Sequence, residues 1–115
     1  MTTEQFVSIL RSVVRDATVA NVPKTLAHPP GRAPAADLVA LSKWYRGLPP
    51  EDQLMLRRVV EYSVDATMFH VLCVLDGAAA IEDPGERGEL VLEHVGPRGR
   101  TRLNDPAADS LHELW

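Results

Sequence analysis

The sequence predicts a mainly α-helical protein of the α+β type: a small helical bundle around a central apolar helix, followed by a C-terminal β-hairpin and a short terminal helix. Two observations support this prediction. Apolar residues recur at helical spacing over most of the first 80 residues, and strand-like alternation begins only near residue 90. Residues 64–77 are apolar on nearly every side, so the other elements are expected to cover them.

The chain of 115 residues fits a single domain, 1–115, that can bury one core without disulfide bonds. Hydrophobic residues make up 45% and charged residues 24%, which is typical of a globular protein rather than a disordered chain. The net charge of -4 argues against nucleic acid as the main partner, because phosphate binding requires clustered Lys and Arg. We expect a charged partner to be a protein with a basic surface.

The sequence also predicts a cytoplasmic location. The single cysteine, Cys73, cannot form an internal disulfide bond, as is usual in a reducing compartment. The first residues lack a basic leader followed by an apolar segment, and no apolar run reaches the roughly 20 residues that span a bilayer. We therefore expect neither a signal peptide nor contact with a membrane.

The first helix is predicted over residues 3–20. Thr2 and Gln5 form the pattern of a capping box, and apolar residues follow at helical spacing. Four prolines and one glycine then fall within residues 21–34, so this proline-rich segment is predicted to be a long loop. We expect the loop to wrap against the body of the protein, with a binding loop as the alternative.

Two further helices precede the hairpin. The second is predicted to begin near Ala35 and to end at Gly47, a common helix stop. The third begins at Pro50 and continues into the apolar stretch. Unbroken to residue 79, it would be about 45 Å long, which exceeds the width of a domain of this size. We therefore expect a kink or short break near residues 63–67, or a first half that protrudes.

The C-terminal segment is predicted to form a hairpin and a final helix. An Asp-Pro-Gly turn signal at 83–85 precedes two strands, over 89–95 and 100–103. The hairpin is expected to cover one end of the bundle. Asp105 followed by Pro106 predicts the start of a short helix that adds three apolar side chains to the core: Leu111, Leu114 and Trp115.

His70 and Cys73 lie three residues apart and would share one face of the central helix, the spacing at which two ligands or a nucleophile and its base can meet. Their neighbours are apolar, and no second cysteine or nearby histidine completes a zinc site. We therefore predict a buried, hydrogen-bonded His70 beside an unreactive Cys73, with no metal ion and no cofactor. The alternative is a small-molecule or metal-binding enzyme that uses a His70/Cys73/Asp76 site.

A set of polar side chains forms a second candidate. Asp65 and Asp76 are nearly aligned on the central helix, and acids on a partly buried face need partners. The candidate partners are Arg46, Arg58 and His112. The predicted polar network consists of Asp65, His70, Asp76, Asn104, Asp105 and His112.

Five acids around the predicted turn and first strand form the candidate partner-binding surface: Glu82, Asp83, Glu86, Glu89 and Glu93. Such a cluster is usually a solvated surface. As a functional surface, it would attract a basic partner and accelerate the encounter. The sequence contains no Gly-rich phosphate loop, serine elbow or HExxH motif that would specify an enzyme.

The segment FHVLCVLDG, followed by IED, a strand hairpin, LNDP and LHEL, resembles a group of small uncharacterised bacterial proteins over residues 44–115. Small acidic domains of this kind are similar to immunity proteins, which neutralise the toxins of competing bacteria. The resemblance implies no catalytic residues and draws attention to four positions: Asp76, Asn104, Asp105 and His112. We predict a non-catalytic protein-binding domain, with an immunity-type inhibitor of a bacterial toxin as its specific form.

Overall fold

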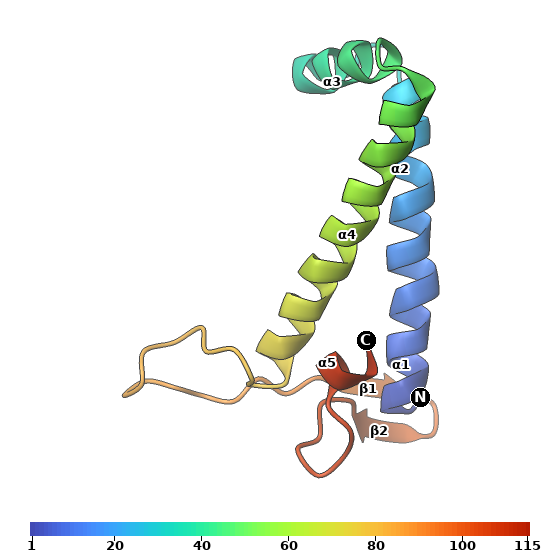
Figure 1. Ribbon diagram of the computed structural model, residues 1–115. Coiled ribbons are helices and arrows are strands. Elements are labelled where there is room, and N and C mark those ends of the chain that lie inside the picture. The colour runs from blue at the N-terminus through green and yellow to red at the C-terminus, as the bar shows by residue number, and fades with distance from the viewer.

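The computed structural model describes all 115 residues and is built on a two-helix hairpin (Figure 1). The N-terminal arm is one continuous helical segment made of three parts: α1 (Thr3–Ile9), η1 (Leu10–Asp16) and α2 (Ala17–Ala27). The second arm is α4 (Pro50–Leu75), and α3 (Ala36–Arg46) lies across the tip where the two arms are joined. At the other end lie β1 (Glu93–Gly96), β2 (Gly99–Arg102) and α5 (Leu111–Leu114). The predicted class, mainly α with a C-terminal hairpin and a short terminal helix, is confirmed.

The N-terminal arm begins as predicted but is longer. The backbone N–H of Gln5 donates to Thr2 Oγ1 at 3.2 Å, and that of Thr2 donates to Gln5 Oε1 at 2.9 Å, which completes the capping box. The middle of the arm is wound as a π-helix, a rare form. The helix then continues through Pro23 to Ala27, so the predicted loop is wrong for residues 21–27. Pro23 is buried in a groove that Tyr45 of α3 also lines, and packing of its ring offsets the lost hydrogen bond.

The helix α4 runs unbroken from Pro50 to Leu75, so the kink expected near residues 63–67 is absent. Ser63 Oγ donates to the carbonyl of Val59, and Thr67 Oγ1 donates to that of Ser63, each at 2.7 Å. These polar side chains are thus satisfied inside the helix and do not break it. The protein accommodates the long helix by being elongated, with extents of 50 × 37 × 29 Å.

The β-hairpin lies below the open end of the two arms (Figure 1). Its strands pair antiparallel, from Glu93 opposite Arg102 to Gly96 opposite Gly99, and are shorter than predicted. Thr3 Oγ1 donates to the Leu103 carbonyl at 2.9 Å, so the hairpin covers one end of the helical arms as expected. The terminal helix begins at Leu111 rather than near residue 106, because residues 105–108 form a turn.

The core is small and lies where the arms meet the C-terminal segment. Val7, Leu72 and Leu111 form its buried centre, surrounded by partly buried Phe6, Leu10, Leu75, Leu92, Leu114 and Trp115. Only 10 of 115 residues are buried, and Phe69, His70 and Val71 of the 64–77 stretch are exposed. The expectation that this stretch is covered all round is therefore wrong, because the N-terminal arm and α5 together leave part of its surface open.

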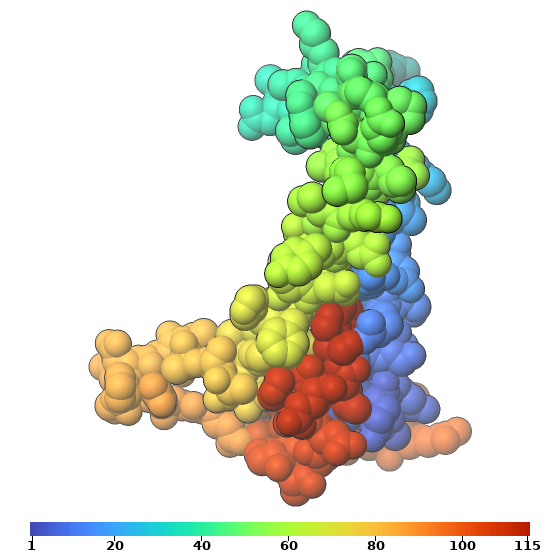
Figure 2. Space-filling model, in the orientation of Figure 1, coloured from blue at the N-terminus to red at the C-terminus, as the bar shows by residue number.

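The shape of the molecule leaves one side of α4 open. In Figure 2, α3 (teal) and residues 77–92 (yellow to orange) project to the same side of α4. Between these two segments, that side of α4 is uncovered. The radius of gyration is 18.4 Å, whereas a compact domain of this length has about 13 Å. None of the helices combines the length and apolar character needed to cross a membrane.

Candidate functional site

The five acids predicted to bind a partner are all exposed, on the segment between α4 and β1 and on β1 itself. Three of them interact within the chain. Glu82 accepts a hydrogen bond from the backbone N–H of Gly88 at 3.3 Å, Glu89 pairs with Arg102, and Glu93 pairs with Arg100 at 3.5 Å. Asp83 and Glu86 are left without an ion pair.

The acidic character is confined to residues 82–89, which we call the acidic loop. It contains four acids, Glu82, Asp83, Glu86 and Glu89, and one base, Arg87. On the hairpin that follows, the charge of Glu93 is offset by three arginines: Arg98, Arg100 and Arg102. The acidic surface that could bind a partner is therefore limited to residues 82–89 and does not extend to Glu93, as the sequence had suggested.

The predicted polar network separates into unconnected parts. Asp76 and His112 form one part, since Asp76 Oδ2 lies 2.7 Å from His112 Nδ1 and accepts the backbone N–H of His112 at 2.9 Å. The Asp76 side chain is 8% exposed, so it binds α5 to the end of α4 in a largely buried position. Asp105 is not part of this group, because its carboxylate accepts the N–H of Ala107 at 3.0 Å in a local turn.

Asn104 joins the loop, the hairpin and α4 through a single buried amide. Its Nδ2 donates to the carbonyls of Leu75 at 2.6 Å and Leu90 at 2.8 Å, and its Oδ1 accepts the N–H of Leu92 at 2.9 Å. Buried backbone groups must find such partners, so this residue closes the long loop against the end of α4. Its role is structural.

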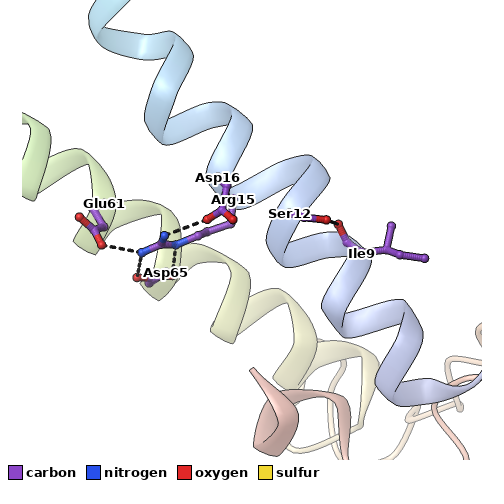
Figure 3. Close-up of polar contacts among 6 residues, drawn as sticks. All are labelled: Ile9, Ser12, Arg15, Asp16, Glu61 and Asp65. Carbon is purple, nitrogen blue, oxygen red and sulfur yellow. Dashed lines mark hydrogen bonds and ion pairs between the residues drawn. The ribbon is translucent and has the colours of Figure 1, made fainter.

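Of the three partners predicted for Asp65 and Asp76, His112 binds Asp76, whereas Asp65 is bound by Arg15. Arg15 reaches from η1 to α4 and donates to both carboxylate oxygens of Asp65 at 3.0 and 3.1 Å (Figure 3). The same guanidinium pairs with Glu61 at 2.7 Å and Asp16 at 2.9 Å. The hydrogen bonds from Arg15 lower the pKa of Asp65. Burial opposes this effect, and the positive charges of Arg15 and Arg11 add to it.

His70 is exposed and its side chain has no hydrogen-bond partner, so the predicted buried, hydrogen-bonded His70 is wrong. Its ring lies edge-on to Phe69, with 5.9 Å between centroids. Cys73 is buried, as expected, and Asp76 interacts with His112 instead. The His70/Cys73/Asp76 set is therefore not assembled, and no three His, Cys, Asp or Glu side chains are grouped so that they could hold a metal ion.

Sequence reasoning missed an exposed apolar stripe along α4. Its members are separated alternately by four and three residues, the a/d spacing of a coiled coil. They form what we call the outer stripe: Met55, Val59, Tyr62, Ala66 and Phe69. Met55 is 54%, Val59 57%, Tyr62 77% and Phe69 41% exposed. The heptad spacing was present in the sequence and could have revealed this stripe.

The other face of α4 is the one that the chain itself covers. Its apolar residues are partly or fully buried: Leu56, Val60, Val64, Met68, Leu72 and Leu75. These also recur at three- and four-residue spacing. The helix therefore has two apolar faces, and the N-terminal arm covers only one of them.

A groove of ≈ 740 Å³ lies between α2, α3 and the first half of α4. Its lining includes four basic side chains and one histidine, and we call it the basic groove: Lys24, Arg46, Arg57, Arg58 and His28. The one acid in its lining, Glu61, is already paired with Arg15. Lys24, Arg46, Arg57 and Arg58 form no ion pair within the chain. The groove is thus positively charged, although the protein is acidic overall and the first turns of α3 and α4 carry Asp37, Glu51 and Asp52.

Comparison with family models, curated proteins and solved structures finds no match. The function is therefore inferred from the surface features of the chain. Three features stand out: the outer stripe in the middle of α4, the basic groove at the tip and the acidic loop at the other end.

The Arg15–Asp65 pair makes stability depend on pH. Folding lowers the pKa of Asp65 below its ordinary value of about 3.9. The pair therefore stabilises the folded state above about pH 4 and loses this effect as the pH falls through the lower folded pKa. Asp65→Asn should reduce the free energy of unfolding by about 1 kcal/mol at pH 7, since the pair is partly exposed. In urea titrations, the reduction should shrink below pH 4. Asp109→Asn, an exposed acid without an ion pair, is the control; an equal effect of both variants would contradict the assignment.

Asn104→Ala should detach the loop from the end of α4. The substitution leaves the Leu92 N–H and the Leu75 carbonyl without their partner, at a cost of about 1–3 kcal/mol for a buried unsatisfied group. Urea unfolding measures this loss, and hydrogen exchange should show faster exchange of the Leu92 amide. Asn21→Ala, on the exposed side of α2, is the matched control and should change stability by a few tenths of a kcal/mol at most. Unchanged protection of Leu92 would show that Asn104 does not hold the loop.

Proposed function

We propose that this protein is a non-catalytic protein-binding module whose main binding surface is the outer stripe of α4. The observation that supports the proposal is the heptad spacing of apolar side chains on a face that the chain leaves open from Met55 to Ala66. At its C-terminal end the stripe borders α5, where the Phe69 ring lies edge-on to that of His112 with 5.8 Å between centroids. Soluble monomers rarely expose contiguous apolar patches of more than a few hundred Å² unless the patch binds something. Heptad spacing fits a partner helix, since knobs from one helix then enter holes on the other.

The polar side chains at the C-terminal end of α4 also support a binding role rather than a catalytic one. Asp76, His112 and Asn104 each bond to another part of the chain and hold the C-terminal segment in place. Their geometry is that of a scaffold that fixes the end of α4. These side chains are therefore occupied in holding the C-terminal segment, and the outer stripe is the part of α4 that is free to bind a partner.

An immunity-type inhibitor of a bacterial toxin is the more specific form of this proposal. It is motivated by the resemblance of residues 44–115 to small bacterial proteins of a kind that is similar to immunity proteins, together with the unpaired carboxylates of Asp83 and Glu86 on the acidic loop. In this form the outer stripe supplies the apolar contact, and the loop steers a basic partner toward it. The loop alone carries too few unpaired acids to be the main contact.

A photo-crosslinking amino acid tests the proposed surface directly. We expect p-benzoylphenylalanine at position 62 to form a covalent adduct with a protein in cells, because Tyr62 is the most exposed member of the stripe. The same group at Ser8, an exposed position on α1, is the control and should give no adduct. Adducts are detected by their mass shift on denaturing gels. Val59→Glu should abolish the adduct from position 62, and no adduct at 62, or equal adducts at 62 and 8, would contradict the proposal.

A further inference from the structure

We infer that the partner on the outer stripe is a second copy of this chain, with the two α4 helices packed antiparallel and Tyr62 at the two-fold axis. The inference rests on the proposed function, since it names the partner of that surface. Three independent observations support it: the symmetry of the stripe, the separation of charge along the molecule and the amount of exposed surface.

The outer stripe is nearly symmetric about Tyr62. Val59 and Ala66 lie three residues before and four after it, and Met55 and Phe69 lie seven residues away on either side. A two-fold interface requires that if residue i of one copy contacts residue j of the other, then j also contacts i. Antiparallel packing meets this condition with Met55 opposite Phe69, Val59 opposite Ala66, and Tyr62 opposite its own copy. The small Ala66 leaves room beside the large Tyr62 ring.

Tyr62 also lies at the middle of α4, which runs from Pro50 to Leu75. Two helices crossing there antiparallel overlap along their whole length, about 39 Å at 1.5 Å per residue. The tip of one copy then lies beside the acidic loop of the other. Every turn of the outer stripe is covered in this arrangement.

The charge distribution favours the antiparallel arrangement over the parallel one. The basic groove lies beside the first half of α4, and the acidic loop follows its C-terminal end. Antiparallel packing places the half of α4 that carries unpaired Arg57 and Arg58 beside the half of the partner's α4 that leads to unpaired Asp83 and Glu86. Parallel packing would bring together groups of like charge, which is unfavourable.

The two segments that project beside α4 carry exposed apolar side chains of their own. Val39, Leu41 and Trp44 are exposed on α3, and the segment between α4 and β1 exposes three more: Ile81, Leu90 and Val91. Both segments project to the side of α4 that is open (Figure 2). In the antiparallel pair, α3 of one copy approaches the 77–92 segment of the other, so these side chains gain an apolar neighbour.

The exposed area matches the size of such an interface. The chain exposes 8193 Å², whereas a compact monomer of this mass exposes about 6,200 Å². The excess of about 2,000 Å² per chain corresponds to about 4,000 Å² for a pair, within the range of roughly 2,000–5,000 Å² for obligate homodimers. A second copy would cover the surface that one chain leaves open.

Sedimentation velocity over a concentration series tests whether the pair forms. The wild-type protein should sediment as a dimer, and Val59→Glu should weaken the dimer by about 100-fold or more, because the change buries an unpaired charge in the interface. Thr67→Glu, an exposed position on α4 outside the stripe, is the control and should remain dimeric. Reversing Asp83 and Glu86 to Arg should weaken the dimer by about 10-fold at low salt and less at high salt.

Cysteine crosslinking tests the arrangement without relying on a destabilised variant. With Cys73→Ser as background, Tyr62→Cys should form an intermolecular disulfide on mild oxidation, because the two positions meet at the axis. Met55→Cys should form none, since antiparallel packing places the two copies of position 55 about 21 Å apart along the helices. A disulfide at 55, or none at 62, would overturn the antiparallel pair.

The outcomes separate this inference from the proposed function. A wild-type protein that stays monomeric at all concentrations overturns the inference. If position 62 nevertheless crosslinks to a different protein in cells, the proposed binding surface is retained with another partner. If position 62 crosslinks to no protein and the chain is monomeric, both proposals are wrong.

Discussion

The structure depends on the packing of one long helix that is apolar on two opposite faces. Leu56, Val60 and Met68 of α4 face the part of the chain that covers them, whereas Val59 and Tyr62 lie on the open side. A single neighbouring arm can cover only one of the two faces. The core is therefore confined to the end of the hairpin, and the rest of α4 needs a further partner if its apolar area is to leave water.

Polar interactions fix this helix in its interior and at its C-terminal end. Arg15 binds Asp65 and so sets how the N-terminal arm lies along α4, and Asn104 and the Asp76–His112 pair close the C-terminal segment on its last turn. Each of these groups makes more than one hydrogen bond, which limits the orientations that the segment can adopt. The chemistry of these side chains is used to hold α4 in position, which leaves its outer face as the surface available for function.

Local signals predicted much of the fold. The capping box at Thr2, the glycine after α3 and Pro50 at the start of α4 all mark the helix ends seen in the structure. Pro23 misled the prediction because its ring packs in a groove formed by other helices, which no local rule can reveal. Likewise, the partner of Asp65 lies 50 residues earlier in the chain.

The candidate site was less predictable, because burial is a property of the whole arrangement. His70 was expected inside a bundle and is exposed, since no third helix covers that side of α4. The measurement that tests this account most directly is an isotope-filtered NOE experiment on a mixture of differently labelled chains. It should show a contact between the Met55 methyl group and the Phe69 ring, which lie about 21 Å apart along one helix and can meet only between copies. A dimer without this contact, or one with contacts between the two copies of Met55, would contradict the account.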